Sequence, residues 1–226
     1  MPERFPTLTL VRHGATAWTD TGQHTSRTDL PLTPSGAAQA TMAGEHWRAR
    51  IEAGAAPRPR FALTSPRRRA RETADRVLAA LAPLAVLAAA PAALQEWDYG
   101  AYEGLTSAEI RARPGGAAWT VFTAPTPGGE TGAAVGARAD AVLAAVRDRQ
   151  RRAAADAAAT AAAVHDDPCH GICFSHGHFL RVLCARWLGL PPKDGRHFQL
   201  DPGAISVLGY DHGEAEPCIK LWNWQA

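Results

Sequence analysis

Short apolar runs alternate along this chain with longer stretches whose apolar residues recur at helical spacing. The runs that predict strands cover residues 8–11, 61–64, 84–87, 171–175, 204–210 and 218–222. The stretches that predict helices cover residues 33–53, 65–81, 133–164 and 180–188. Because strands and helices alternate, we expect an α/β protein, a three-layer α/β/α sandwich around a mainly parallel sheet.

The region between residues 100 and 132 departs from this alternation. Glycine and proline are frequent at 100–104 and at 114–132, which is typical of irregular segments inserted over a site. The length of 226 residues suits one domain. We therefore predict a single domain over residues 1–226 with a cap-like insertion at about 100–132.

Composition narrows the class of protein. A hydrophobic fraction of 46% supports a substantial core, and a net charge of +2 argues against a nucleic-acid partner. The four cysteines do not form the pattern of a disulfide scaffold. The chain shows neither a leader peptide nor a run of about 18 apolar residues, so we expect a cytoplasmic protein with no membrane partner.

Two histidines follow apolar runs in the same way. The tripeptide RHG (12–14) comes directly after the first run, and SHGH (175–178) ends the fourth. In an open parallel sheet, ligands bind at the carboxyl ends of the strands. If these two strands are neighbours, His13 and His176 meet above the sheet.

Two further segments add charge at comparable places. SPRRRAR (65–71) follows the second apolar run, and LQEWDYG (94–100) carries two acids. An imidazole beside a fixed guanidinium group suits attack on a phosphoryl group, and a nearby carboxyl group suits proton transfer. Four separate segments can therefore converge with a nucleophile, cations and an acid.

Six motifs, in order along nearly the whole chain, resemble those of the histidine phosphatase superfamily in its phosphoglycerate-mutase-like branch. They are LVRHGATAW, HTSRTDLPLTPSG, SPRRRARETA, LQEWDYGAYEG, PGGET and FSHGHFLRVL. Within the family, the chain is most similar to small acid-phosphatase-like and sedoheptulose-bisphosphatase-like members. The resemblance implies a hydrolase of small phosphorylated metabolites that works through a phosphohistidine.

The resemblance also implies a role for each matching residue. His13 would be the nucleophile, and Arg12, Arg69 and His176 would bind the transferring phosphoryl group. Glu96 would protonate the leaving oxygen and later deprotonate the attacking water. The substrate contacts expected around them come from Thr16, Thr19, Thr25, Ser26, Trp97, Asp98, Tyr99, Gly177 and His178.

We expect no metal and no cofactor. Neighbouring guanidinium groups disfavour a second positive charge and keep His13 a free imidazole. Fixed donors stabilise the transferring phosphoryl group, as Mg²⁺ does in other enzymes. The segment 169–178 holds two cysteines and three histidines, but its Cys-x₃-Cys spacing is not the usual spacing of a zinc site.

Two other functions stay open. A cofactor-dependent phosphoglycerate mutase is the first, but Ala15, Ala17 and Thr19 depart from the family's nucleophile motif and favour a hydrolase. A catalytically weak interaction module is the second, and it predicts the loss of a catalytic group, whereas all five are present.

The natural substrate and the oligomeric state are open as well. Arg27, Arg111 and Arg113 are the residues considered for contact with a second phosphate group. Trp222 and Trp224, near the C-terminus, are those considered for a homodimer interface.

Overall fold

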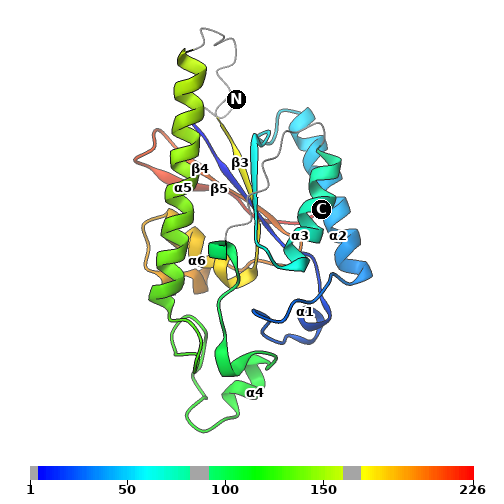
Figure 1. Cartoon of the computed structure of the whole chain (residues 1–226), viewed down its shortest axis with the longest axis vertical. Coiled ribbons are helices and arrows are strands. Elements are labelled where there is room, and N and C mark those ends of the chain that lie inside the picture. Colours follow the sequence, from blue (N-terminus) through cyan, green and yellow to red (C-terminus); the bar gives the residue numbers. More distant parts are fainter. Residues whose placement is uncertain (1–4, 82–91, 160–168) are drawn as a thin grey trace.

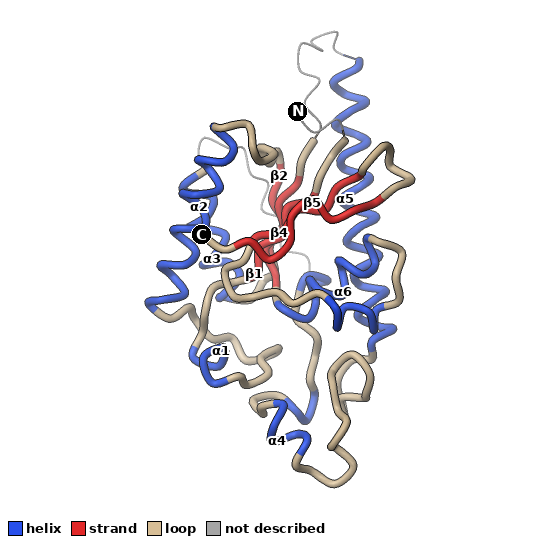
Figure 2. The backbone as a smooth tube through the Cα atoms, turned by 180° about the vertical axis from the view of Figure 1, so that it is seen from behind, coloured by secondary structure: helices blue, strands red, loops and turns tan. Residues whose placement is uncertain are grey.

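A five-stranded sheet forms the centre of the molecule (Figures 1 and 2). The computed structural model describes residues 5–81, 92–159 and 169–226. The strands are β1 (Leu8–Arg12), β2 (Phe61–Thr64), β3 (Gly171–Ser175), β4 (Ile205–Tyr210) and β5 (Pro217–Trp224). Each matches a predicted strand, and the further strand predicted at 84–87 lies outside the described residues.

The strand order is β2-β3-β1-β4-β5. β1 and β2 both pair with β3 in parallel, whereas β4 is antiparallel to both β1 and β5. Four strands therefore run in one direction and β4 opposes them, which confirms the expected α/β class. The pairing of Arg12 with Ser175 brings the carboxyl ends of β1 and β3 level with each other.

Helices cover both faces of the sheet. α2 (Pro34–Glu52) and α3 (Arg68–Ala80) lie on one face, and α5 (Gly132–Ala159) and α6 (Gly177–Trp187) lie on the other (Figure 1). Neighbouring strand residues face opposite layers: Leu10 packs in the core beneath α5 and α6, and Val11 packs in the core beneath α2 and α3. The three-layer sandwich is thus as predicted. No described helix is long and apolar enough to cross a membrane.

Short elements extend past the carboxyl end of the parallel strands. They are α1 (Ala17–Thr21), α4 (Ser107–Arg111) and three 3₁₀ turns at Ala92–Leu94, Gly100–Tyr102 and Pro192–His197. α1 and α4 lie together at the lower end of the molecule in Figure 1. Hydrophobic periodicity cannot reveal them, because each has little more than one turn. Thr16 and Thr106 begin these two helices, each through a capping box.

The start of α2 packs against the main chain that follows β1. A Cβ atom on Gly36 would lie 2.1 Å from the carbonyl oxygen of Ala15. We expect Gly36→Ala to lower the free energy of unfolding by about 1–3 kcal/mol, because backbone would have to move. Urea unfolding checks this, with Gly213→Ala as the control, since a Cβ atom there meets nothing within 4 Å. Equal effects of the two changes would contradict the prediction.

Candidate active site

His13 lies directly after β1, with only 6% of the residue exposed. Its Nδ1 is 2.8 Å from the carbonyl oxygen of Gly14. A carbonyl only accepts, so Nδ1 carries and donates the proton, and Nε2 is unprotonated. That Nε2 accepts a hydrogen bond from Nε of Arg69 at 3.3 Å. The carbonyl of Gly14 therefore fixes the tautomer of the ring, and the lone pair of Nε2 points toward Arg69.

The surroundings keep His13 neutral. Burial lowers its pKa well below the ordinary value, and the positive charges of Arg69 and Arg12 lower it further. The hydrogen bond to Gly14 acts in the opposite direction and does not outweigh them. The imidazole is thus available as a nucleophile without first losing a proton.

Two arginines from different elements flank this imidazole. Arg69, in the first turn of α3, is fully buried, and its guanidinium donates to the carbonyl oxygens of Thr25 and Thr28 at 3.0 and 3.1 Å. Arg12, the last residue of β1, donates to the carbonyl oxygen of Leu200. Among the described residues, the buried Nε of Arg12 has no acceptor within hydrogen-bond distance. These cations are held in place by the main chain rather than by carboxylates.

His176, which follows β3, completes the pair of imidazoles. Its ring centroid is 5.2 Å from that of His13, so the two histidines meet as the strand pattern predicts. Its Nε2 lies 2.7 Å from Oγ of Ser65, whereas its buried Nδ1 has no partner in the described part of the chain. Burial, together with Arg69 and His13, lowers the pKa of His176 well below the ordinary value.

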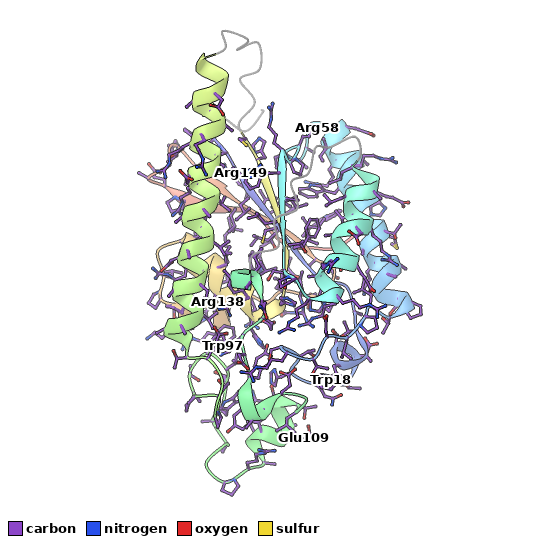
Figure 3. All side chains as sticks on the ribbon, in the orientation of Figure 1. Trp18, Arg58, Trp97, Glu109, Arg138 and Arg149 are labelled. Carbon is purple, nitrogen blue, oxygen red and sulfur yellow. The ribbon has the colours of Figure 1, made fainter. Side chains whose placement is uncertain are left out.

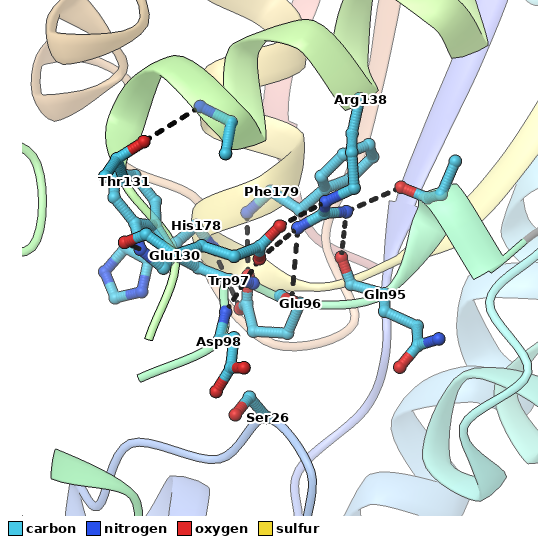
Figure 4. Close-up of polar contacts among 12 residues, drawn as sticks. Ser26, Gln95, Glu96, Trp97, Asp98, Glu130, Thr131, Arg138, His178 and Phe179 are labelled. Atoms are coloured by element: carbon cyan, nitrogen blue, oxygen red, sulfur yellow. Dashed lines mark hydrogen bonds and ion pairs between the residues drawn. The ribbon is translucent and has the colours of Figure 1, made fainter. Parts of the chain in front are cut away.

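Glu96 places a carboxylate at the first turn of α6 (Figure 4). Its Oε1 accepts from the main-chain N–H groups of Trp97 and Phe179, both at 2.8 Å, and its Oε2 accepts from that of His178 at 3.0 Å. The N-terminal end of a helix favours a negative charge. Oε1 takes two hydrogen bonds and Oε2 only one, so Oε2 has room for a proton.

An open cavity adjoins these groups. Arg12, His13 and Glu96 line it, and the predicted substrate contacts that line it are Thr19, Thr25, Tyr99, Gly177 and His178. Arg69 and His176 do not line it but adjoin His13, Arg69 through a hydrogen bond to Nε2 and His176 through its ring. The five predicted catalytic groups and five of the nine predicted substrate contacts are thus brought together.

The other four predicted contacts do not line this cavity. Thr16 caps α1, and Trp97 is 1% exposed and donates its indole N–H to the carbonyl oxygen of Glu130. Ser26 and Asp98 border a neighbouring hollow. There, Ser26 donates its hydroxyl to Glu103, and Asp98 pairs with Arg27 at 2.5 Å.

Some residues of the cavity could not be singled out from the sequence. Its remaining lining residues are Trp18, Gly22, Gln23, His24, Arg181 and Leu200. His24 packs against Tyr99 with ring centroids 4.7 Å apart, and burial lowers its pKa to about 4. The hydroxyl of Tyr99 in turn lies 2.6 Å from Nδ1 of His178. His24 stands inside the matched motif HTSRTDLPLTPSG, which is the one signal that pointed to it.

Glu103 organises the loop that Arg69 also holds. Its carboxylate accepts the main-chain N–H groups of Ser26 and Thr28, each at 3.0 Å, and the Ser26 hydroxyl. Burial alone would raise the pKa of Glu103, but these hydrogen bonds outweigh it and lower the pKa. The acid therefore acts as an ionised anchor for this loop.

The cysteines and histidines of 169–178 do not gather into a metal site. No three of their ligand atoms come together, and within the described ranges such a group forms only from Asp211, His212 and Glu216. Those three side chains are exposed at the β4–β5 turn, far along the sequence from the residues around His13.

The neutral histidines predict how stability depends on pH. Burial is the largest cause of the lowered pKa in His13, His24, His176 and His178. The unfolded chain then binds more protons below about pH 6.5, so the free energy of unfolding falls with falling pH, by up to about 1.4 kcal/mol per pH unit for each histidine.

Urea unfolding between pH 7.5 and 4.5 measures this slope. The pKa of His24 is about 4 in the folded protein. Between pH 6.5 and about 4, His24→Gln should therefore reduce the number of protons taken up on unfolding by up to one, and the slope of the unfolding free energy against pH with it. A midpoint that is constant or rises as the pH falls would contradict the prediction.

Two imidazoles, two guanidinium groups and a carboxylate meet at the carboxyl ends of adjacent parallel strands. These are the features of an enzyme that acts on phosphate esters. The family model of the histidine phosphatase superfamily (branch 1) matches residues 8–225. The chain therefore belongs to the histidine phosphatase superfamily, and it is a phosphatase enzyme.

Individual relatives agree with this assignment. An acid phosphatase of Mycobacterium tuberculosis is 37% identical over 207 residues, which cover 91% of this chain and 87% of that protein. The sedoheptulose 1,7-bisphosphatase of Saccharomyces cerevisiae is 30% identical, with 98% of this chain and 94% of that protein covered. The solved structure of an M. tuberculosis open reading frame has a TM-score of 0.78 at 33% identity and covers 97% of this chain and 98% of its own.

Proposed function

We propose that this phosphatase hydrolyses monoesters of small phosphorylated metabolites by way of a phosphohistidine at Nε2 of His13, without a metal ion. The observation that carries the proposal is the state of His13. Its Nδ1 donates to Gly14, its pKa is lowered, and its unprotonated Nε2 accepts a hydrogen bond from Nε of Arg69.

In the first step, Nε2 of His13 forms a bond to phosphorus while the ester oxygen leaves. Arg12, Arg69 and His176 stabilise the negative charge on the equatorial oxygens of the transferring phosphoryl group. Two unpaired buried groups support this role. Nε–H of Arg12 has no acceptor among the described residues, and a phosphoryl oxygen supplies one. Nδ1 of His176 has no partner there either, and it donates to a phosphoryl oxygen in the tautomer in which Ser65 donates to Nε2.

Glu96 serves as acid and then as base. Its Oε2 gives a proton to the leaving oxygen and later takes one from the water that attacks the phosphohistidine. This second attack releases phosphate and restores the neutral His13. We also propose that residues 100–132 cap the cavity, since α4 and its neighbours lie beyond the carboxyl end of the sheet (Figure 1).

A mutase is less well supported. Arg111 donates to the carbonyl oxygen of Trp119, Arg113 lies over the ring of Tyr102, and Arg27 pairs with Asp98, so each of the arginines considered for a second phosphate has another contact. Hydrolysis needs no second phosphate site and is the function we favour.

The proposed site likewise does not need a second copy of the chain. The five catalytic groups all come from one chain. Trp224 packs on Trp47 with ring centroids 6.0 Å apart, and Trp222 packs on Phe198 at 5.6 Å. Cys173 and Cys184 form no disulfide, which suits the reducing cytoplasm that we propose as the location.

Phosphate release from a panel of sugar phosphates, sugar bisphosphates and phosphoglycerates, measured in the presence of a chelator, tests this function. We expect turnover that chelation does not reduce. A separate reaction with 3-phosphoglycerate and 2,3-bisphosphoglycerate distinguishes the mutase, which would form 2-phosphoglycerate with little free phosphate. No release from any monoester would overturn the proposal.

A further inference from the structure

An ion pair between Arg138 and Glu130 joins the start of α5 to the segment before it. Nε of Arg138 is 2.7 Å from Oε1 of Glu130, and its Nη2 is 2.7 Å from Oε2. Less than a quarter of either side chain is exposed. A guanidinium and a carboxylate that meet through two parallel hydrogen bonds have a fixed relative orientation.

This pair holds the segment that carries Glu96 in place (Figure 4). Figure 3 labels Arg138 near Trp97, the residue that follows Glu96. Arg138 donates to three main-chain carbonyl oxygens, those of Ala93 at 2.7 Å, Gln95 at 3.0 Å and Glu96 at 3.4 Å. Glu130 accepts the main-chain N–H of Asp98 at 3.0 Å, and its own N–H donates to the carbonyl oxygen of Asp98 at 2.9 Å. The main chain is thereby held on both sides of Glu96.

Arg138 also touches the other anchor of the Glu96 carboxylate. Its guanidinium lies 5.0 Å from the centroid of the Phe179 ring. The main-chain N–H of Phe179 is one of the three donors to that carboxylate. A single side chain therefore contacts both the segment that delivers the carboxylate and a residue of the helix turn that receives it.

We propose that Arg138, fixed by Glu130, is a positioning residue that keeps Glu96 at the proton-transfer position. Arg138 does not line the cavity around His13; it borders the neighbouring hollow together with Glu96 and Glu130, and we assign its effect on the reaction to Glu96. This inference rests on the proposed function, because it needs Glu96 to be the acid. A displacement of about 1 Å at a reacting group can cost roughly 10²-fold in rate.

The dependence on the leaving group separates positioning from general damage. A nitrophenolate leaves without a proton, whereas an alkoxide needs one. We expect Arg138→Ala to lower kcat/KM for an alkyl phosphate such as β-glycerophosphate about tenfold more than for 2,4-dinitrophenyl phosphate. The ratio of the two rates on one sample does not depend on how much of the protein is folded. Arg138→Lys should show part of the same shift, because an ammonium group cannot form the two-bond pair.

Arg186→Ala is the matched control. Arg186 also forms a two-bond pair with a carboxylate of α5, that of Asp140, but it makes no hydrogen bond to residues 93–98. Its ratio of alkyl to aryl rates should equal that of the wild type. An equal loss on both substrates in Arg138→Ala, or the same shift in Arg186→Ala, would overturn the positioning role.

Glu96→Gln keeps the two hypotheses distinguishable. If Glu96 is the acid, this variant shows a larger shift of the ratio than Arg138→Ala does, and adding Arg138→Ala to it shifts the ratio no further. If Glu96→Gln leaves the ratio unchanged, the acid role fails and the positioning role falls with it. If Glu96→Gln shifts the ratio and Arg138→Ala does not, only the positioning role is wrong.

Discussion

Replacing His13 by alanine should reduce kcat/KM for every phosphomonoester by at least about 10⁴-fold, because no other group can form the covalent intermediate. His176 cannot substitute for it, since its Nε2 contacts Ser65 and its ring does not line the cavity. Release of phosphate from 4-nitrophenyl phosphate measures the loss. A rapid quench after mixing with a substrate that carries a radioactive phosphoryl group checks the intermediate itself. The wild type should retain acid-labile, base-stable radioactivity, and His13→Ala should retain none.

His212→Ala is a suitable control for this experiment, because that side chain is 78% exposed at the β4–β5 turn. It should leave both the turnover and the labelling intact. Turnover in His13→Ala within tenfold of the wild type would show that another residue is the nucleophile.

The proximity of the two histidines was predictable, because the sequence next to each strand shows at which edge of the sheet its histidine lies. A buried apolar strand that ends in RHG or SHGH puts its histidine at the carboxyl edge. Parallel pairing then brings His13 and His176 together with no further information. The arginine-rich segment follows β2, which also pairs with β3 in parallel, so its place at the same edge was predictable in the same way. The choice of Arg69 among its arginines, and the role of Glu96, depended on the family resemblance.

Contacts between distant segments were not predictable. Thr16 and Trp97 belong to matching motifs, yet a helix cap and the core take up their polar atoms. Glu103 reaches back 77 positions to Ser26, and Arg138 reaches back 42 positions to Glu96. A charged side chain is most often solvated. Only the folded arrangement therefore shows that Glu103 and Arg138 hold loops of the site.

The second large effect is expected for Arg69→Gln, which should lower kcat/KM about 10²–10³-fold through the loss of donors to the phosphoryl group. The change also removes a positive charge that lowers the pKa of His13. With that pKa raised, His13 is protonated over more of the acidic range, and only the free imidazole attacks. The ratio of variant to wild-type kcat/KM should therefore fall further as the pH is lowered below about 6.5.

Arg69→Lys separates charge from geometry at the same position. The ammonium group keeps the pKa of His13 low, so the acidic side of the profile should follow the wild type. It cannot, however, reproduce the planar fork that now donates to Thr25 and Thr28 and faces His13, so the rate should stay well below the wild type at every pH. A lysine variant with the full rate, or a glutamine variant whose ratio to the wild type is constant with pH, would show that Arg69 does not act on His13 in this way.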